Sequence, residues 1–341
     1  MVPLIVIRNL PRNTTRVPTA FVTGATGFYG LNLIKRLRED GWNVTALHLP
    51  SADLTFLSKF DADCVTGDVT DADSVLRSMP ANVDAVFHLA ASVNFWRRNN
   101  DDQTRVNVDG TRNVVDAALS RGAKRFVQAS SMWAFAPEDG TVLREDTPSQ
   151  ASSHWVNYFR TKWLADEQVR NGVERGLHAS FVGPGFTVGP YELSNTSQLF
   201  TLLKAGKLPG AFPGSGPWCH VDSVVDAMIR ASEVASPGDM YLIGSVHASF
   251  AEVAAKAASR LDVKAPRPLP AWLLKSLARL MDLGSRVTGK EPDITPELAH
   301  MFSLNFSLDC AKAERELDYQ EKSLDVMLDD MYTWLLAENR I

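Results

Sequence analysis

The chain has 341 residues, of which 45% are apolar and 22% are charged, and its formal net charge is −5. This length allows a large core or about two domains, and no apolar run reaches the roughly 18 residues that a membrane span needs. Positive and negative residues are intermixed without a basic block, which argues against nucleic acid as a partner.

Cysteine usage and the N-terminus indicate the compartment. Cys64, Cys219 and Cys310 lie far apart without the spacing of metal ligands, so we expect no metal site and a reducing environment. The apolar stretch over residues 2–7 is too short for a secretory signal, and basic residues follow it instead of preceding it. We therefore expect residues 1–18 to be an N-terminal extension of a cytoplasmic protein.

Strands and helices are predicted to alternate from residue 19 onward. The apolar run 19–23 predicts a strand, a glycine-rich turn follows over 24–30, and the next helix carries Leu31, Ile34 and Leu37. The same criteria predict strands over 44–49, 63–65, 85–89, 125–129 and 179–182, and helices over 106–120 and around 158–170. Such alternation is typical of α/β proteins, so we expect a Rossmann-type, doubly wound parallel sheet over residues 19–183.

The sequence changes in character at Pro184, where Gly/Pro-rich segments and separate helices begin. We expect residues 184–341 to form a smaller, mainly helical substrate cap, interleaved with a last sheet strand near 240–245. The segment 271–283 (AWLLKSLARLMDL) is amphipathic and carries Lys275 and Arg279. It predicts either a helix on a membrane surface or a cap helix that packs its leucine face inward, and we expect the second.

Three glycines, Gly24, Gly27 and Gly30, follow the first predicted strand and open the first helix in TGATGFYG. In a dinucleotide site the first permits a tight turn, the second lets the backbone approach the pyrophosphate, and the third lets the helix lie close to the strand. The phosphates then face a helix N-terminus, whose free N–H groups favour anions. Glycines that serve only a turn are the alternative.

The end of the second strand bears on the choice of coenzyme, because an acidic side chain there binds the ribose 2′-hydroxyl of NAD. Here the strand ends in His48 and Leu49, followed by Pro50 and Ser51, with neither a carboxylate nor an arginine. His48 and Ser51 are able to donate hydrogen bonds to a 2′-phosphate. We therefore expect NADP, with NAD as the alternative.

Tyr158 and Lys162 stand four residues apart in a predicted helix, so both project from one face. An adjacent ammonium stabilises phenolate and is expected to lower the tyrosine pKa from about 10 toward neutrality. The pair is then able to exchange a proton with a substrate oxygen. Ser131, just past the strand at 125–129, is the candidate for binding that oxygen, in preference to Ser130.

With TGATGFYG, GDVTD, FHLAA, NVDGT, the paired serines and YFRTK in this order, the chain resembles the extended short-chain dehydrogenase/reductase family. It is most similar to the dihydroflavonol 4-reductase-like branch, and the resemblance runs from about residue 19 to the end. It implies Ser131, Tyr158 and Lys162 as the catalytic triad, with Lys162 also holding the nicotinamide ribose. The family's arginine near Leu49 is absent, and Gly183 replaces its usual asparagine.

The resemblance also implies where the coenzyme binds along the chain. Asp68 and Val69 border the adenine, and Ala90 and Ala91 line the coenzyme. The expected contacts also include residues of the glycine-rich turn and of two strand ends: Thr26, Phe28, Tyr29, Leu89 and Pro184.

Aromatic residues gather in the segments expected around the nicotinamide, and we expect Trp96, Trp133 and Phe186 to contact substrate. Such side chains favour a hydrophobic or aromatic carbonyl compound over a sugar, unless they fill the core of the cap instead. The sequence thus predicts an NAD(P)H-dependent reductase or dehydrogenase of a small molecule, as a monomer or homodimer. An epimerase or dehydratase that retains NAD and a non-catalytic dinucleotide-sensing protein are the alternatives.

Overall fold

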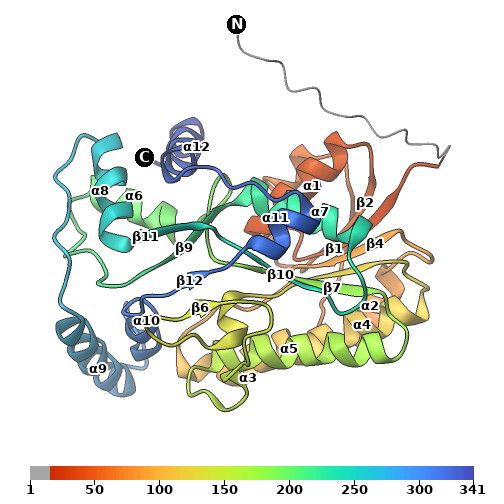
Figure 1. Cartoon of the computed structure of the whole chain (residues 1–341), viewed down its shortest axis with the longest axis horizontal. Helices are drawn as coiled ribbons and strands as arrows, with labels where there is room; N and C mark the ends of the chain where they lie inside the picture. The colour runs from red at the N-terminus through yellow and green to blue at the C-terminus, as the bar shows by residue number, and fades with distance from the viewer. Residues whose placement is uncertain (1–15) are drawn as a thin grey trace, which may run out of the picture.

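A parallel sheet of seven strands forms the centre of the computed structural model, which describes residues 16–341 (Figure 1). The strand order is β10-β7-β5-β4-β1-β2-β3, and every neighbouring pair is parallel. The strands are β1 (Thr19–Thr23), β2 (Asn43–His48), β3 (Asp63–Thr66), β4 (Ala85–His88), β5 (Phe126–Ala129), β7 (Ala179–Pro184) and β10 (Met240–Ile243). The N-terminal extension lies outside the described residues, apart from residues 16–18.

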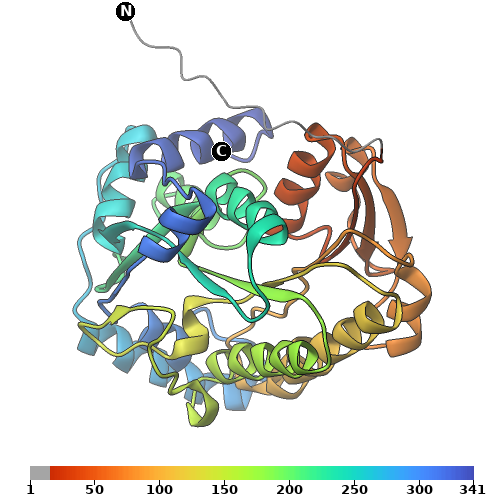
Figure 2. The same cartoon turned by 45° about the vertical axis from the view of Figure 1, so that its right-hand side comes forward.

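Helices cover both faces of this sheet, as expected for the doubly wound Rossmann fold (Figures 1 and 2). On one face α4 (Gly110–Ser120) packs between α2 (Ala72–Ser78) and α5 (Asn157–Glu174), and on the other α1 (Phe28–Glu39) packs against α7 (Val221–Val234). The central strands are buried and mostly apolar, and Phe21, Phe87, Phe126 and Phe181 are fully buried between the two layers. Continuous apolar strands are what a sheet covered on both sides requires.

The chain after β7 builds the cap, except for α7, β10 and α11 (Ala311–Leu317), which return to the main sheet. A small sheet in the order β11-β9-β8 joins β8 (Phe186–Val188), β9 (Ser215–His220) and β11 (Val246–Ser249). A two-residue pairing links β6 (Val142–Leu143) to β12 (Ser307–Leu308). The cap helices are α6 (Thr196–Lys204), α8 (Phe250–Arg260), α9 (Ala271–Thr288), α10 (Pro296–Met301) and α12 (Leu324–Ala337).

The helix α9 differs from the expectation that its leucine face packs inward. Within it, Leu274, Ala278 and Ser285 are buried. Leu274 and Ala278 pack against Ala299 in a small separate cluster, whereas the four other leucines of the helix are exposed. The apolar residues of α9 occupy a wider part of the helix circumference than α10 covers, so the remaining apolar side chains face water.

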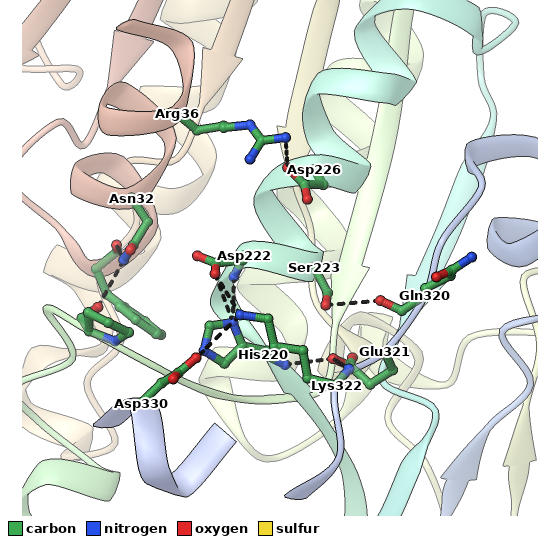
Figure 3. Close-up of polar contacts among 12 residues, drawn as sticks. Asn32, Arg36, His220, Asp222, Ser223, Asp226, Gln320, Glu321, Lys322 and Asp330 are labelled. Carbon is green, nitrogen blue, oxygen red and sulfur yellow. Dashed lines mark hydrogen bonds and ion pairs between the residues drawn. The ribbon is translucent and has the colours of Figure 1, made fainter. Parts of the chain in front are cut away.

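The C-terminal segment is fastened to the N-terminus of α7 by a polar network around His220 (Figure 3). His220 caps α7, its Nδ1 accepts a hydrogen bond from the Asp222 backbone at 3.0 Å, and its Nε2 lies 3.2 Å from an Asp330 carboxylate oxygen. Glu321 accepts a hydrogen bond from the His220 backbone at 3.0 Å, and Lys322 pairs with Asp222 at 2.8 Å. We assign this network a structural role.

No helix within residues 16–341 is long and apolar enough to cross a membrane. In the same range, no group of three or more His, Cys, Asp or Glu side chains is arranged to hold a metal ion.

Candidate active site

The glycine-rich turn is packed so closely that two of its glycines have no room for a side chain. Gly24 has φ +68°, and a Cβ there would lie 2.7 Å from the Ala90 backbone nitrogen and 2.8 Å from the Leu89 carbonyl carbon. A Cβ on Gly30 would lie 2.2 Å from the Gly24 carbonyl oxygen. The first and third glycines therefore bring β1, α1 and the end of β4 into direct backbone contact, as the roles deduced from sequence require.

The N-terminus of α1 is free of side-chain caps. Gly27 is the N-cap residue, and the first turn contains no acidic side chain. The first-turn N–H groups of a helix have no intrahelical partner, so this end suits an anionic ligand. Thr26 and Gly27 lie at this mouth, with Phe28 and Tyr29 in the first turn. These residues fit the pyrophosphate of a dinucleotide.

Tyr29 differs from the other residues of the turn because its side chain is tied to the cap. Its hydroxyl lies 2.7 Å from Oγ1 of Thr187 on β8, and its ring stacks on Phe28 at 5.2 Å. Burial raises its pKa well above the usual value. The hydroxyl is therefore a neutral link between the glycine-rich turn and the cap.

The residues expected around the 2′-position lie at the end of β2. His48 is half-buried, with Nδ1 2.9 Å from the Leu49 carbonyl oxygen, and Ser51 is exposed. Asp53, which sequence reasoning passed over, is the first carboxylate after this strand. It accepts hydrogen bonds from the backbone and hydroxyl of Thr55 at 2.9 and 2.6 Å, and these hydrogen bonds lower its pKa.

Three further segments approach the carboxyl edge of the sheet. The Asp68 carboxylate accepts from the Thr70 backbone at 2.8 Å, and Val69 packs against Gly110 of α4. Leu89 and Ala90 follow β4, and both donate their backbone N–H to the Thr23 hydroxyl at 3.2 Å. The next residue, Ala91, is exposed. Pro184 is buried at the end of β7.

The structure brings Ser131, Tyr158 and Lys162 together beside the end of β5. Ser131 follows this strand, and the other two lie one turn apart on α5. All three side chains are buried, and Ser131 forms a hydrogen bond with the Tyr158 hydroxyl. The Lys162 Nζ donates a hydrogen bond to the Ala129 carbonyl oxygen at 2.5 Å.

The tyrosine pKa does not follow the expectation drawn from the lysine spacing. Burial raises the pKa of Tyr158 to about 12, and the hydrogen bond from Ser131 acts in the opposite direction. Burial also lowers the pKa of Lys162, while the Asp166 carboxylate raises it. The expected shift of the tyrosine toward neutrality is therefore wrong for this arrangement, because desolvation outweighs the other contributions.

Asp166 is a functional candidate that sequence reasoning missed. It lies one turn beyond Lys162 on α5, is buried, and accepts a hydrogen bond from the Ser130 hydroxyl at 2.5 Å. Burial raises its pKa to about 6, against the opposing effect of the nearby Lys162 charge. The available signal was the four-residue spacing from Lys162, since a carboxylate at that distance faces the ammonium. Ser130 thus anchors Asp166, whereas Ser131 contacts Tyr158.

Asn107 also organises the site. It lies in a π-helical turn over Arg105–Asp109 that leads into α4. Its side chain exchanges hydrogen bonds with the backbone of Ser92 at 2.7 and 3.0 Å and donates to the Thr161 hydroxyl at 3.1 Å. Thr161 precedes Lys162, so Asn107 joins the loop after β4 to the catalytic helix. The sequence contained this residue in NVDGT without any indication of its partners.

His88 is buried under the site as a neutral imidazole. Its Nδ1 lies 2.7 Å from the Thr23 hydroxyl and its Nε2 lies 3.0 Å from the Thr111 hydroxyl. Burial, with a smaller contribution from the Lys162 charge, lowers its pKa to about 3. It packs the sheet against α4 and has no free nitrogen for proton transfer.

The residues expected to contact substrate lie in different surroundings. Trp133 is buried and stacks on Phe159 at 4.7 Å, and the half-buried Phe186 packs edge-on against Trp133 at 5.9 Å. Trp96 is half-buried under the Arg98 guanidinium, at 5.2 Å. Phe95, its neighbour, packs edge-on against Tyr158 at 5.4 Å. An apolar ring thus lies directly beside the phenol, while much of the aromatic cluster fills the cap.

Residues 20–244 match the model of the NAD-dependent epimerase/dehydratase family. The chain belongs to this family. It is accordingly an NAD(P)-dependent oxidoreductase of the extended short-chain dehydrogenase/reductase type, with a Rossmann-like sheet that carries the coenzyme site.

Several relatives cover almost the whole chain of this family member. A candidate dihydroflavonol 4-reductase of Synechocystis sp. is 27% identical over 92% of this chain and 93% of its own. Sterol demethylase protein B of Methylococcus capsulatus is 25% identical over 95% of this chain and 100% of its own. The crystal structure of gox2253 superposes with a TM-score of 0.81 at 26% identity, covering 95% of this chain and 99% of its own.

Proposed function

We propose that this protein is an NAD(P)H-dependent reductase or dehydrogenase acting on the carbonyl or hydroxyl group of a small hydrophobic or aromatic compound. The observation that carries the proposal is the buried Tyr158 hydroxyl, held by Ser131 and flanked by the ring of Phe95. Apolar surroundings beside a proton donor suit a substrate with a hydrophobic body and one polar oxygen. The names of the two relatives, which refer to a flavonoid and a sterol, support the same substrate class.

The coenzyme supplies hydride to the carbonyl carbon when it is bound. In the proposed arrangement Gly24, Gly27 and Gly30 form the phosphate cradle at the N-terminus of α1. His48 and Ser51 face the 2′-position, which supports NADP as the preferred coenzyme. Asp68 and Val69 border the adenine, and the other assigned contacts are Thr26, Phe28, Tyr29, Leu89, Ala90, Ala91 and Pro184.

The chain's own residues handle the proton. Ser131 binds the substrate oxygen and orients it toward Tyr158. With a pKa of about 12, Tyr158 holds its proton throughout the neutral range and gives it to the oxygen as negative charge develops there. The ammonium of Lys162, backed by Asp166, then stabilises the phenolate. In this scheme Trp96, Trp133 and Phe186 shape the pocket.

We also propose a cytoplasmic enzyme that is a monomer or a homodimer. Cys64, Cys219 and Cys310 are unpaired thiols in the structure, which supports a reducing compartment. NAD(P)H is available there as the reductant.

A turnover assay tests the function. Full-length protein is incubated with NADPH or NADH and a panel of dihydroflavonols, steroid ketones and aromatic aldehydes, and coenzyme oxidation is followed. We expect turnover with at least one class, and a Tyr158→Phe variant is expected to lose about 10²- to 10⁴-fold in kcat while binding coenzyme normally. Turnover by Tyr158→Phe equal to that of the wild type would contradict the proposal. Tightly retained NAD without net redox turnover would instead support the epimerase alternative.

A further inference from the structure

The helix α9 (Ala271–Thr288) exposes more apolar surface than any packing role in the described structure explains. Six of its large apolar side chains are exposed, including Trp272 at 69%, Leu280 at 67% and Val287 at 89%. The others are Leu273, Leu277 and Leu283. Contiguous exposed apolar surface of this kind marks an interaction site more often than a free surface.

The side chains of α9 fall into three stripes along the helix. At 3.6 residues per turn, Leu274, Ala278 and Ser285 share one line, and these are the buried residues. The next stripe around the helix is basic and consists of Lys275, Arg279 and Arg286. The exposed apolar residues form the third stripe, which adjoins the basic one and lies roughly opposite the buried line.

The segment around α9 is positive within an acidic protein. Residues 264–290 contain six Lys or Arg residues and one acidic residue, Asp282, whereas the whole chain has a formal charge of −5. Asp282 forms a salt bridge with Arg286 at 2.8 Å. No acidic side chain on the exposed face of α9 is therefore left to pair with Lys275 or Arg279.

We propose that α9 docks the protein on the surface of a lipid bilayer that contains anionic lipids. The apolar stripe enters the boundary between headgroups and acyl chains, and the adjoining basic stripe meets the anionic headgroups. Trp272 has the amphipathic ring that is favoured at this level of a bilayer. The four charged residues within the helix, Lys275, Arg279, Asp282 and Arg286, hold it in the plane of the interface, because charges in the bilayer centre are costly.

A second copy of the chain fits this face less well. A two-fold interface places the same patch of both copies in contact, so the basic stripes would meet without acidic partners. Anionic headgroups complement both the apolar and the basic stripe.

Docking would turn the substrate side of the molecule toward the lipid. The helix α9 packs against α10, and both lie on the side of the molecule opposite α12 (Figures 1 and 2). Glu297 of α10 accepts a hydrogen bond from Arg97 at 2.8 Å, and the same loop carries Phe95, which packs on Tyr158. Entry of a hydrophobic substrate from the bilayer follows only if the proposed function also holds.

Vesicle co-sedimentation of the full-length protein tests the docking without any turnover, so failure of the proposed function leaves the test valid. We compare vesicles of phosphatidylcholine alone with vesicles that also contain phosphatidylglycerol, at low and high salt. The wild type should bind the anionic vesicles, and added salt should weaken that binding. The double variant Leu280→Ser/Val287→Ser should partition about tenfold or more weakly. Lys275→Gln/Arg279→Gln should lose about thirtyfold on anionic vesicles.

The matched control is Leu336→Ser, since Leu336 is an exposed leucine on α12, on the opposite side of the molecule from α9. It should bind vesicles as the wild type does. The proposal is overturned if the wild type stays in the supernatant with anionic vesicles at low salt, or if the α9 variants bind as tightly as the wild type. Dimerisation that depends on Leu280 and Val287, without vesicle binding, would assign the face to a second copy and also overturn the proposal.

Discussion

Gly24 provides the sharpest test of how the coenzyme cradle is built. In Gly24→Ala the new Cβ would lie within 2.9 Å of three backbone atoms of Leu89 and Ala90, which cannot rotate away. The left-handed φ of +68° adds about 1–2 kcal/mol for any residue with a Cβ. Overpacking against backbone adds about 1–3 kcal/mol, so we expect a loss of about 2–5 kcal/mol in the free energy of unfolding.

Gly41→Ala is the matched control. Gly41 has φ +81°, but a Cβ there would meet no atom within 4 Å, so only the conformational cost of about 1–2 kcal/mol applies. Urea unfolding of both variants, followed by circular dichroism, separates the clash from the backbone strain. Titration with NADPH should show weaker binding for Gly24→Ala and unchanged binding for Gly41→Ala. Equal losses of stability and normal NADPH affinity in both variants would refute the reasoning.

Three further predictions concern charge. Burial lowers the pKa of His88 to about 3, so the unfolded chain binds a proton that the folded chain refuses, and each pH unit below about 6.5 costs about 1.4 kcal/mol of stability. The pKa of Asp166 is raised to about 6, so its contribution to stability is present below about pH 4 and is lost as pH rises to about 6. The two pH dependences have opposite signs. In urea unfolding, the stability of Asp166→Asn relative to wild type should rise with pH between about 4 and 6, and that of His88→Gln should fall over the same range. Variant profiles that run parallel to the wild-type profile would contradict both pKa shifts. Ser51→Asp should weaken NADPH binding about tenfold relative to NADH binding, because it adds a carboxylate near the 2′-position of the coenzyme. An unchanged ratio of the two affinities would show that Ser51 does not lie near the 2′-position. Below its pKa of about 12, the phenolate fraction of Tyr158 grows tenfold per pH unit. The kcat/KM for alcohol oxidation should therefore rise about tenfold per pH unit from about pH 7 to about pH 10, while the rate of carbonyl reduction changes little. A flat pH profile for oxidation would show that Tyr158 is not the base.

The main sheet was predictable because its central strands are buried on both faces. The strand predicted over 19–23 agrees with β1, and the strand predicted near 240–245 contains β10, since each is an apolar run bounded by a proline, a glycine or a polar residue. The strands β8, β9 and β11 were missed. β8 and β9 lie in Gly/Pro-rich segments, β11 is only four residues long, and all three owe their conformation to partners distant in sequence. The helix at 100–104 was also missed, since NDDQT has no apolar periodicity.

For α9, the sequence revealed amphipathicity but not its direction. A leucine-rich stripe predicts a face that avoids water, and the usual partner is the protein's own core. Here the core contact is made by Leu274 and Ala278, on the opposite side from Leu280 and Val287. Only the position of α10 determines which stripe is covered, and that position depends on tertiary packing.

The proposed catalytic residues illustrate the same limit in electrostatic terms. The four-residue spacing of Tyr158 and Lys162 places them on one face of α5, but it does not determine the sign of the pKa shift. Desolvation raises the pKa of Tyr158, lowers that of Lys162 and raises that of Asp166, and in each case it is the largest cause. All three groups are thereby shifted toward their neutral forms. It follows that the Tyr-x-x-x-Lys spacing predicts which groups meet, whereas their burial in the fold sets the direction in which their pKa values shift.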